Sequence, residues 1–111
     1  MAGQLPLSET TFLILLSLSP GPRHGYAILK AVESMSEGRV LLSTGTLYGA
    51  IKRLLEAGLI RRIDDPLPNP TERLRKTYVL APYGRQVLNA EMGRIRKLAA
   101  LIPEQARGVG L

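Results

Sequence analysis

The stretch from Ser43 to Ile60, STGTLYGAIKRLLEAGLI, constrains the fold of this chain more than any other segment. Ser43 is able to cap the start of a helix through its hydroxyl, and Gly58 stands where helices most often end in a left-handed residue. Leu59, just beyond that glycine, is placed to close back on Leu54 in the usual apolar contact of such a stop. The segment therefore predicts a single helix with both ends marked.

This predicted helix has two unlike faces. Its buried stripe is predicted from apolar residues at helical spacing, namely Leu47, Ile51, Leu54 and Leu55. At about 100° per residue, the opposite side carries Thr46, Gly49, Lys52 and Arg53, flanked by Tyr48. A helix in the DNA major groove needs such a short cationic face, because its backbone must come close and its charge must meet phosphate. A merely solvated helix surface is the alternative interpretation, and the neighbouring segments must decide between the two.

The charge of the chain gathers on and just after this helix. Residues 39–85 hold nine basic and four acidic side chains, net +5, out of a formal net charge of +6 for the whole chain. Residues 1–38 hold two basic against three acidic side chains (net −1), and residues 86–111 hold four against two (net +2). A cationic cluster of this kind suits a polyanionic partner, which favours double-stranded DNA.

Several classes of protein are disfavoured by what the sequence lacks. The chain has no cysteine, which excludes disulfides, thiolate nucleophiles and cysteine-based zinc sites. No paired carboxylates, metal-ligand cluster or nucleophile with a base stands out, so we expect neither an enzyme nor a cofactor or metal. His24, the only histidine, fits a local hydrogen bond or a phosphate contact better than a metal site. The apolar run Phe12 to Leu18 is too short to span a bilayer and no signal peptide is evident, so the expected location is cytoplasmic.

The remaining segments predict a winged helix-turn-helix. A first helix is expected from Ser8 until Pro20, a second from about His24 to Met35, and a brief strand at residues 39–42. Residues 59–64 and 75–80 are typical of two strands, and the proline-rich loop between them makes a hairpin with a long basic tip. Three helices followed by a basic hairpin give a mainly α fold with a small β-hairpin.

The longest helix is predicted from Pro82 to about Ile102. Its apolar residues are spaced 4, 3, 4 and 3 apart in a heptad seam made by Leu88, Met92, Ile95, Ala99 and Ile102. A second apolar stripe lies beside the seam and contains Val87, Leu98 and Leu101. One apolar stripe is enough to pack the helix against its own domain. The second stripe therefore predicts a second packing partner, and we expect this partner to be another copy of the chain in a homodimer. The expected organisation is a DNA-binding domain over 1–81, a dimerisation helix over 82–103 and a flexible tail over 104–111.

Three stretches of the chain resemble the PadR family of bacterial transcriptional regulators. They are GPRHGYAI (Gly21–Ile28), the capped helix (Ser43–Ile60) and RKTYVL (Arg75–Leu80), and the resemblance covers about residues 7 to 88. The HGY and GTLY elements together make it specific, whereas either alone would be weak. The resemblance implies a dimeric winged helix-turn-helix repressor that releases its operator when an effector binds. The length is similar to that of the short branch with a single C-terminal helix.

The sequence departs from the family in a few places. Thr44 and Gly49 stand where the family usually has proline, and Ala81 stands where a capping threonine is common. The chain also has no tryptophan, so members that trap flat aromatic drugs between paired tryptophans are a poor guide to an effector. A modest apolar effector in a groove lined by Met92, Ile95 and Ala99 is the expectation, with control by protein concentration alone as the alternative.

The predicted DNA contacts come from the second helix, the third helix and the hairpin. Tyr26 and Tyr48 are open to two interpretations, as aromatic residues at the edge of the core or as phosphate ligands. The expected DNA-binding residues are Arg23, His24, Tyr26, Ser43, Thr44, Thr46, Tyr48, Gly49, Lys52, Arg53, Arg73, Arg75 and Lys76. The competing function is a winged-helix module that binds protein instead of nucleic acid, and salt-sensitive DNA binding would separate the two.

Overall fold

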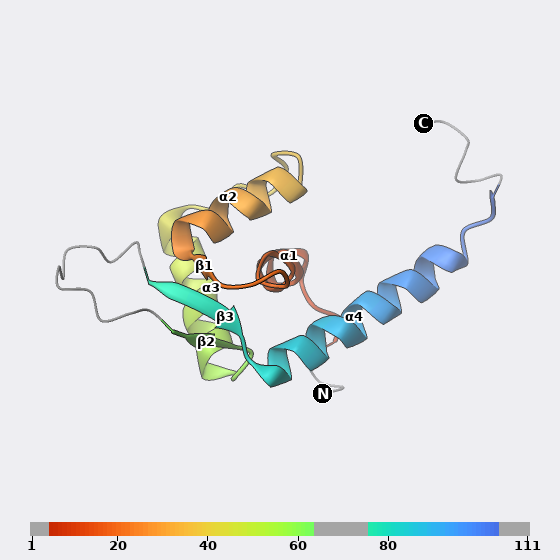
Figure 1. Ribbon diagram of the computed structural model, residues 1–111. Coiled ribbons are helices and arrows are strands. Elements are labelled where there is room, and N and C mark those ends of the chain that lie inside the picture. The colour runs from red at the N-terminus through yellow and green to blue at the C-terminus, as the bar shows by residue number, and fades with distance from the viewer. Residues whose placement is uncertain (1–4, 64–75, 105–111) are drawn as a thin grey trace.

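A computed structural model of the protein describes residues 5–63 and 76–104 (Figure 1). Its element order is α1 (Glu9–Ser17), β1 (Arg23–His24), α2 (Gly25–Met35), α3 (Thr44–Glu56), β2 (Ile60–Arg62), β3 (Thr77–Leu80) and α4 (Pro82–Ala100). The prediction of a mainly helical fold with a small β element is confirmed. The expected loop tip and the end of the expected tail lie outside the described residues.

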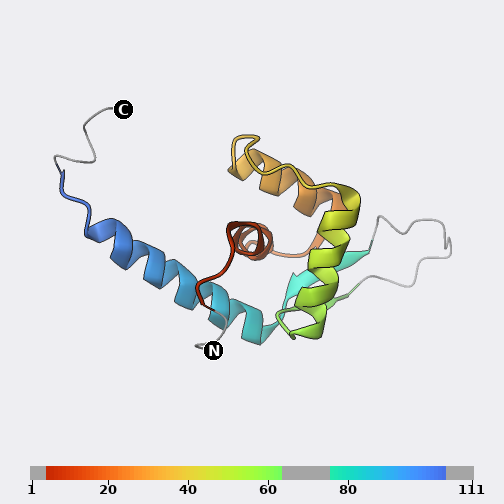
Figure 2. The same ribbon diagram turned by 180° about the vertical axis from the view of Figure 1, so that it is seen from behind.

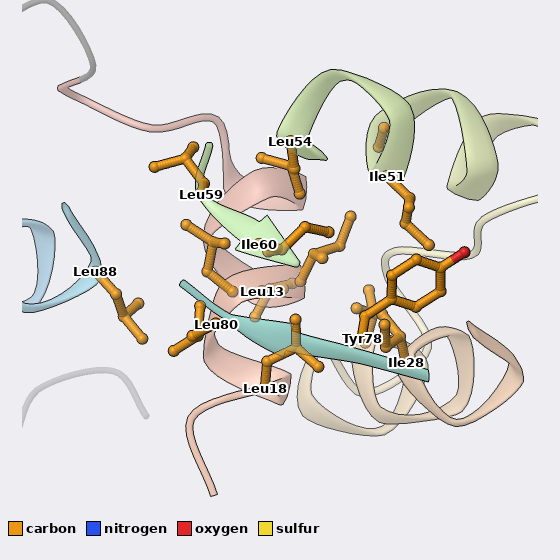
Figure 3. Close-up of a cluster of buried hydrophobic side chains, with 14 of the residues drawn as sticks. Leu13, Leu18, Ile28, Ile51, Leu54, Leu59, Ile60, Tyr78, Leu80 and Leu88 are labelled. Carbon is orange, nitrogen blue, oxygen red and sulfur yellow. The ribbon is translucent and has the colours of Figure 1, made fainter. Parts of the chain in front are cut away.

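Helix α1 forms the centre of the domain because it is apolar on almost every side. Ile14, Leu15 and Leu18 at its C-terminal end are fully buried, which is the usual fate of a helix without a polar face. Figures 1 and 2 show α1 nearly end-on, with α2, α3, the sheet and the first half of α4 around it. The close-up of the core shows the ring of Tyr78 from β3 close to Ile28 of α2 and Ile51 of α3 (Figure 3).

Helix α3 begins and ends where its caps predict. The Ser43 hydroxyl accepts the backbone N–H of Thr46 at 3.1 Å. At the other end Gly58 has φ +77°, which is the left-handed conformation that glycine adopts without steric cost. The N–H groups of Leu59 and Gly58 donate to the carbonyls of Leu54 and Leu55 at 3.0 and 3.1 Å. This pair of bonds is the Schellman motif, and it turns the chain directly into β2.

The sheet has three strands, one more than the predicted hairpin. Its antiparallel order is β1-β3-β2, with Arg23 opposite Tyr78 and Ile60 opposite Leu80. The brief strand expected at residues 39–42 is wrong, because that segment is an irregular connection, and the third strand is β1 instead. Two residues are too few to produce a detectable alternation, so only the pairing with β3 defines this strand.

One residue of the predicted buried stripe of α3 is exposed. Leu55 is 36% exposed. It lies at the margin of the helix's apolar arc, whereas Leu47, Ala50, Ile51 and Leu54 fill the arc and are buried. Helical periodicity predicts the burial of residues at the edge of the apolar face poorly, because the helix buries only one face.

The long helix α4 divides into two halves. Its first turn starts at Pro82 after Ala81, which caps without a side-chain hydrogen bond, and Val87 and Leu88 are fully buried. The assignment of Leu88 to a dimer seam is therefore wrong, since Figure 3 shows it directed at the subunit's own core close to Leu80. From Ile95 to the last described residue every side chain is exposed.

Candidate nucleic-acid interface

The exposed face of α3 carries the residues that the sequence assigned to it. Thr44, Thr46, Lys52 and Arg53 are exposed and Gly49 is partly exposed. A Cβ built on Gly49 would meet only the Arg53 Nη1 at 3.7 Å, which is ordinary van der Waals contact. The backbone at Gly49 is thus open to close approach from outside the subunit, and nothing within the subunit requires a glycine there.

The hydroxyls at the start of α3 are engaged in capping. Besides accepting the Thr46 N–H, the Ser43 hydroxyl donates to the Thr46 Oγ1 at 2.9 Å. Ser8 and Thr11 repeat this arrangement at the start of α1, with the same two distances. The first role of Ser43 is therefore to fix the N-terminus of α3, a contribution of about 1 kcal/mol for such caps.

The start of α2 makes local contacts with β3 and with the end of α1. The His24 Nδ1 lies 3.1 Å from the Thr77 hydroxyl, which agrees with the predicted local hydrogen bond. The Arg23 Nε donates to the carbonyl of Ser17 at 2.6 Å, so this guanidinium also ties β1 to the end of α1. Tyr26 is 58% exposed, and the Lys30 ammonium sits 5.7 Å from the centre of its ring. Lys30 was not among the predicted contacts, although its spacing of four from Tyr26 on a helix places the two side chains on the same face.

The Tyr48 side chain packs inside the domain, at the contact between α3 and the start of α2. Its hydroxyl oxygen is buried and has no hydrogen-bond partner among the residues that the structure describes. A Cβ on Gly25 would lie 2.4 Å from that oxygen and 3.0 Å from the Cζ of the ring. Burial raises the pKa of the Tyr48 phenol. The buried oxygen favours the interpretation of Tyr48 as an aromatic residue at the edge of the core over that of a phosphate ligand. The contact joins the HGY element to the GTLY element.

This packing predicts that substitutions at Gly25 and Tyr48 are coupled. Gly25→Ala should destabilise the fold by about 1–3 kcal/mol, because the added methyl overlaps the phenol. Tyr48→Phe should be neutral or slightly stabilising, since it removes an oxygen buried without a partner. The double variant should then recover about 1 kcal/mol of the cost of Gly25→Ala. Urea denaturation of the four proteins measures the coupling, and strict additivity would contradict the proposed contact.

The elements of this surface meet on one side of the domain. Figure 1 shows α3, the start of α2 and the end of the sheet where β2 stops and β3 begins on the side away from the exposed half of α4. Arg61 and Arg62 are exposed on β2, and Lys76 is half-buried before β3. The predicted contacts Arg73 and Arg75 lie outside the described residues. Where the chain is described, the elements on this side carry exposed cations that we together call the cationic face, namely Lys30, Lys52, Arg53, Arg61 and Arg62.

Other kinds of site find no support in the described parts of the chain. Residues 5–63 and 76–104 contain no group of three His, Asp or Glu side chains that could hold a metal ion. Within the same ranges, no helix has both the length and the apolar character needed to cross a membrane.

Three helices around a buried α1, with α3 exposed beside a small antiparallel sheet, define a winged-helix protein. The chain belongs to the PadR-like family of transcriptional regulators, whose family pattern matches residues 14–90. It is 33% identical over 99 residues to an uncharacterized 37.1 kDa protein of transposon TN4556 from Streptomyces fradiae. That alignment covers 89% of this chain, which spans only about a quarter (26%) of the relative's length.

Solved structures share the fold. A PadR family transcription regulator from Clostridium difficile R20291 has 25% identity and a TM-score of 0.70, with 86% of this chain and 95% of that one covered. A PadR-like transcription factor from Bacteroides fragilis has 22% identity and a TM-score of 0.69, with 91% and 93% covered. Bacillus subtilis PadR, solved in complex with operator DNA, has 23% identity and a TM-score of 0.64, with 78% and 48% covered.

Proposed function

We propose that this protein is a sequence-specific DNA-binding transcriptional regulator that reads its operator with α3. The observation that carries the proposal is the exposed face of α3, where Lys52 and Arg53 flank an open backbone at Gly49. In this arrangement α3 lies in the major groove, while the start of α2 and the hairpin contact the flanking phosphates. Phosphate contacts from the hairpin supply affinity, and contacts from α3 to base edges supply specificity.

Three further features support this proposal. The net charge of +5 on residues 39–85 is complementary to the negative charge of a DNA phosphate backbone. The chain belongs to a family of transcriptional regulators, and the Bacillus subtilis structure holds operator DNA. Tyr26 is exposed in the first turn of α2 with the Lys30 ammonium beside its ring, and the helix before the recognition helix crosses the DNA backbone in this class of proteins.

The direct test is selection of duplexes from a random DNA pool by the purified protein, followed by sequencing of the bound fraction. A shared sequence should be enriched, and its affinity should fall steeply with salt because phosphate contacts release counterions. A protein-interaction module would enrich no sequence, and its weak DNA binding would not distinguish one duplex from another. That result would contradict the proposed DNA-binding function and favour the protein-interaction module.

Gly49→Ala is expected to separate stability from DNA binding. The added methyl meets no atom of the subunit closer than 3.7 Å, so the helix should gain up to about 1 kcal/mol in stability. The same methyl would stand between α3 and the floor of the groove, and affinity for the selected operator should fall about tenfold, by roughly the 1–3 kcal/mol of one good base contact. Fluorescence anisotropy and thermal melting measure the two effects.

A matched glycine provides the control for this experiment. A Cβ built on Gly93 of α4 has no atom within 4 Å, and Gly93 lies far from α3 along the chain. Gly93→Ala should therefore stabilise the protein without changing operator affinity. If Gly49→Ala left the affinity as high as Gly93→Ala does, α3 would not approach DNA along this face.

The proposal extends to a homodimeric repressor whose α4 helices pair through their exposed halves. Ile95, Ala99 and Ile102 continue the predicted seam on exposed turns, and Met92 packs partly against the subunit's own core. An apolar effector that bound between the paired helices would release operator DNA if it bound the two dimer states unequally. Screening apolar metabolites for release of the selected operator tests this, and a screen without active compounds would favour control by concentration alone.

A further inference from the structure

The side chain of Glu91 is a carboxylate buried at the base of the exposed half of α4. It is 1% exposed, although glutamate is rarely buried unless it is paired. Its Oε1 accepts the Arg94 Nε at 2.5 Å, and its Oε2 accepts the Arg94 Nη2 at 3.1 Å. The Oε2 also accepts the backbone N–H of Leu7 at 2.8 Å, from a residue 84 positions earlier in the chain.

These three bonds form a clamp between the N-terminal segment and α4. The Arg94 guanidinium holds the pKa of the Glu91 carboxyl below its usual range, outweighing the rise that burial alone would cause. The Leu7 N–H gives the carboxylate a partner outside its own helix and so ties the segment before α1 to α4. A buried charge that loses such partners is strongly unfavourable, so the clamp holds as a unit.

The position of the clamp along α4 gives it leverage. The other fixed point of the helix is Gly84, where a Cβ would lie 1.8 Å from the carbonyl oxygen of Leu59. Glu91 lies seven residues from this point, about 10 Å along a helix, whereas Ala100 at the end of α4 lies sixteen residues away, about 24 Å. A shift of about 1 Å at Glu91 with Gly84 as the pivot therefore moves the end of α4 by roughly 2.3 Å.

The clamp also marks where α4 leaves the domain. Glu91 is the last buried side chain of α4 within the described residues, and Ile95, Leu98, Leu101 and Ile102 beyond it are exposed. The angle between α4 and the domain is thus fixed between Gly84 and Glu91. In a dimer paired through the exposed halves, that angle sets the distance between the two α3 helices, which must match half-sites about one DNA turn apart.

We propose that Glu91, held by Arg94 and the Leu7 N–H, is a specificity-determining residue that sets the half-site spacing this protein accepts in its operator. Glu91 acts by positioning α4 and touches neither DNA nor the partner subunit. The inference rests on the proposed function of a dimeric DNA reader. It assigns to the segment before α1 a part in choosing the operator, through the hydrogen bond from the Leu7 N–H to Glu91.

The first experiment compares Glu91→Gln with the wild-type protein on the selected operator and on versions with one or two base pairs added or removed between the half-sites. Each base pair changes the separation by about 3.4 Å. Glutamine keeps an acceptor for the Leu7 N–H but loses the charge that Arg94 binds, so α4 should be held less firmly. The preference for the original spacing should fall by about threefold or more. Equal weakening on every duplex would assign Glu91 a merely structural role and overturn the inference.

A second measurement needs no DNA and separates failure of the inference from failure of the proposed function. Because the chain has no cysteine, Glu56→Cys on the exposed end of α3 gives one unique site per subunit for a spin label. Pulsed electron paramagnetic resonance on the full-length dimer should show a broader or shifted label-to-label distance in Glu91→Gln. Glu33→Gln on α2 is the charge-matched control and should leave the distance unchanged.

The outcomes of the distance measurement are distinct. If the wild-type protein selected no DNA but Glu91→Gln altered the distance, the DNA-reading proposal would fail while the positioning role stood. If the distances matched in all three proteins, the positioning role would be overturned even with operator binding intact. Absence of any label-to-label distance would mean that the protein is a monomer. Both the proposed homodimer and the proposed role of Glu91 would then be overturned.

Discussion

Gly84→Ala is expected to cost about 3 kcal/mol of folding free energy, at the upper end of the range for overpacked sites. The Cβ of the alanine would lie 1.8 Å from the carbonyl oxygen of Leu59 and 2.8 Å from its carbonyl carbon. Both are backbone atoms, so no change of rotamer relieves the overlap. The glycine is required here for the close approach of α4 to the end of α3.

The Leu59 backbone is also unable to move away freely. Its N–H donates to the Leu54 carbonyl at 3.0 Å as part of the cap of α3, and its carbonyl accepts the Ala81 N–H at 3.0 Å. A shift large enough for a methyl group would break the helix stop, the start of α4 or both. The melting temperature should fall by about 10–20 °C, as expected for such a loss in a domain of this size.

Gly93→Ala is the matched comparison for this prediction, because it is the same change in the same helix. A Cβ at Gly93 meets nothing within 4 Å, so only the helix propensity changes, by up to about 1 kcal/mol in favour of alanine. The two variants should thus shift the melting temperature in opposite directions in a single calorimetry series. Equal shifts would mean that α4 does not pack against Leu59 as described.

Local features of the fold could be predicted from the sequence because their causes are local. Ser43 and Gly58 bracket α3 through bonds that reach only a few residues, and any segment with those residues at that spacing favours the same cap. The hairpin strands follow from β-branched and aromatic residues around prolines. These signals need no knowledge of what lies elsewhere in the chain.

The features that the sequence did not reveal depend on distant partners. β1 exists only because Arg23 and His24 pair with β3, more than fifty residues later. The burial of Glu91 depends on the Leu7 N–H, 84 positions earlier, and a charged residue on a helix is usually solvated. Leu88 fits a heptad seam, but period alone does not say whether its own core or a partner covers it.

The burial of Leu88 in its own subunit decides which residue of the seam can be substituted to test the proposed dimer. An aspartate at Leu88 would unfold the subunit, since that side chain is fully buried, and the result would say nothing about association. Ile95 is 38% exposed, so Ile95→Asp can be accommodated by the isolated subunit with its carboxylate in water. The same carboxylate would be buried among apolar side chains in a dimer paired through this seam. A folded variant therefore reports on the interface alone.

Ile95→Asp is expected to convert the proposed homodimer into a folded monomer. A twofold interface buries the new carboxylate twice, and each buried charge without a partner costs several kcal/mol. Even about 3 kcal/mol in total weakens dimerisation by roughly a hundredfold. Sedimentation equilibrium should show the monomer, with the melting temperature little changed. Ala100→Asp is the control, because it makes the same change of charge on an exposed residue about 140° around the helix. A stable dimer in Ile95→Asp would rule out this seam, and loss of the dimer in both variants would point to charge instead of packing.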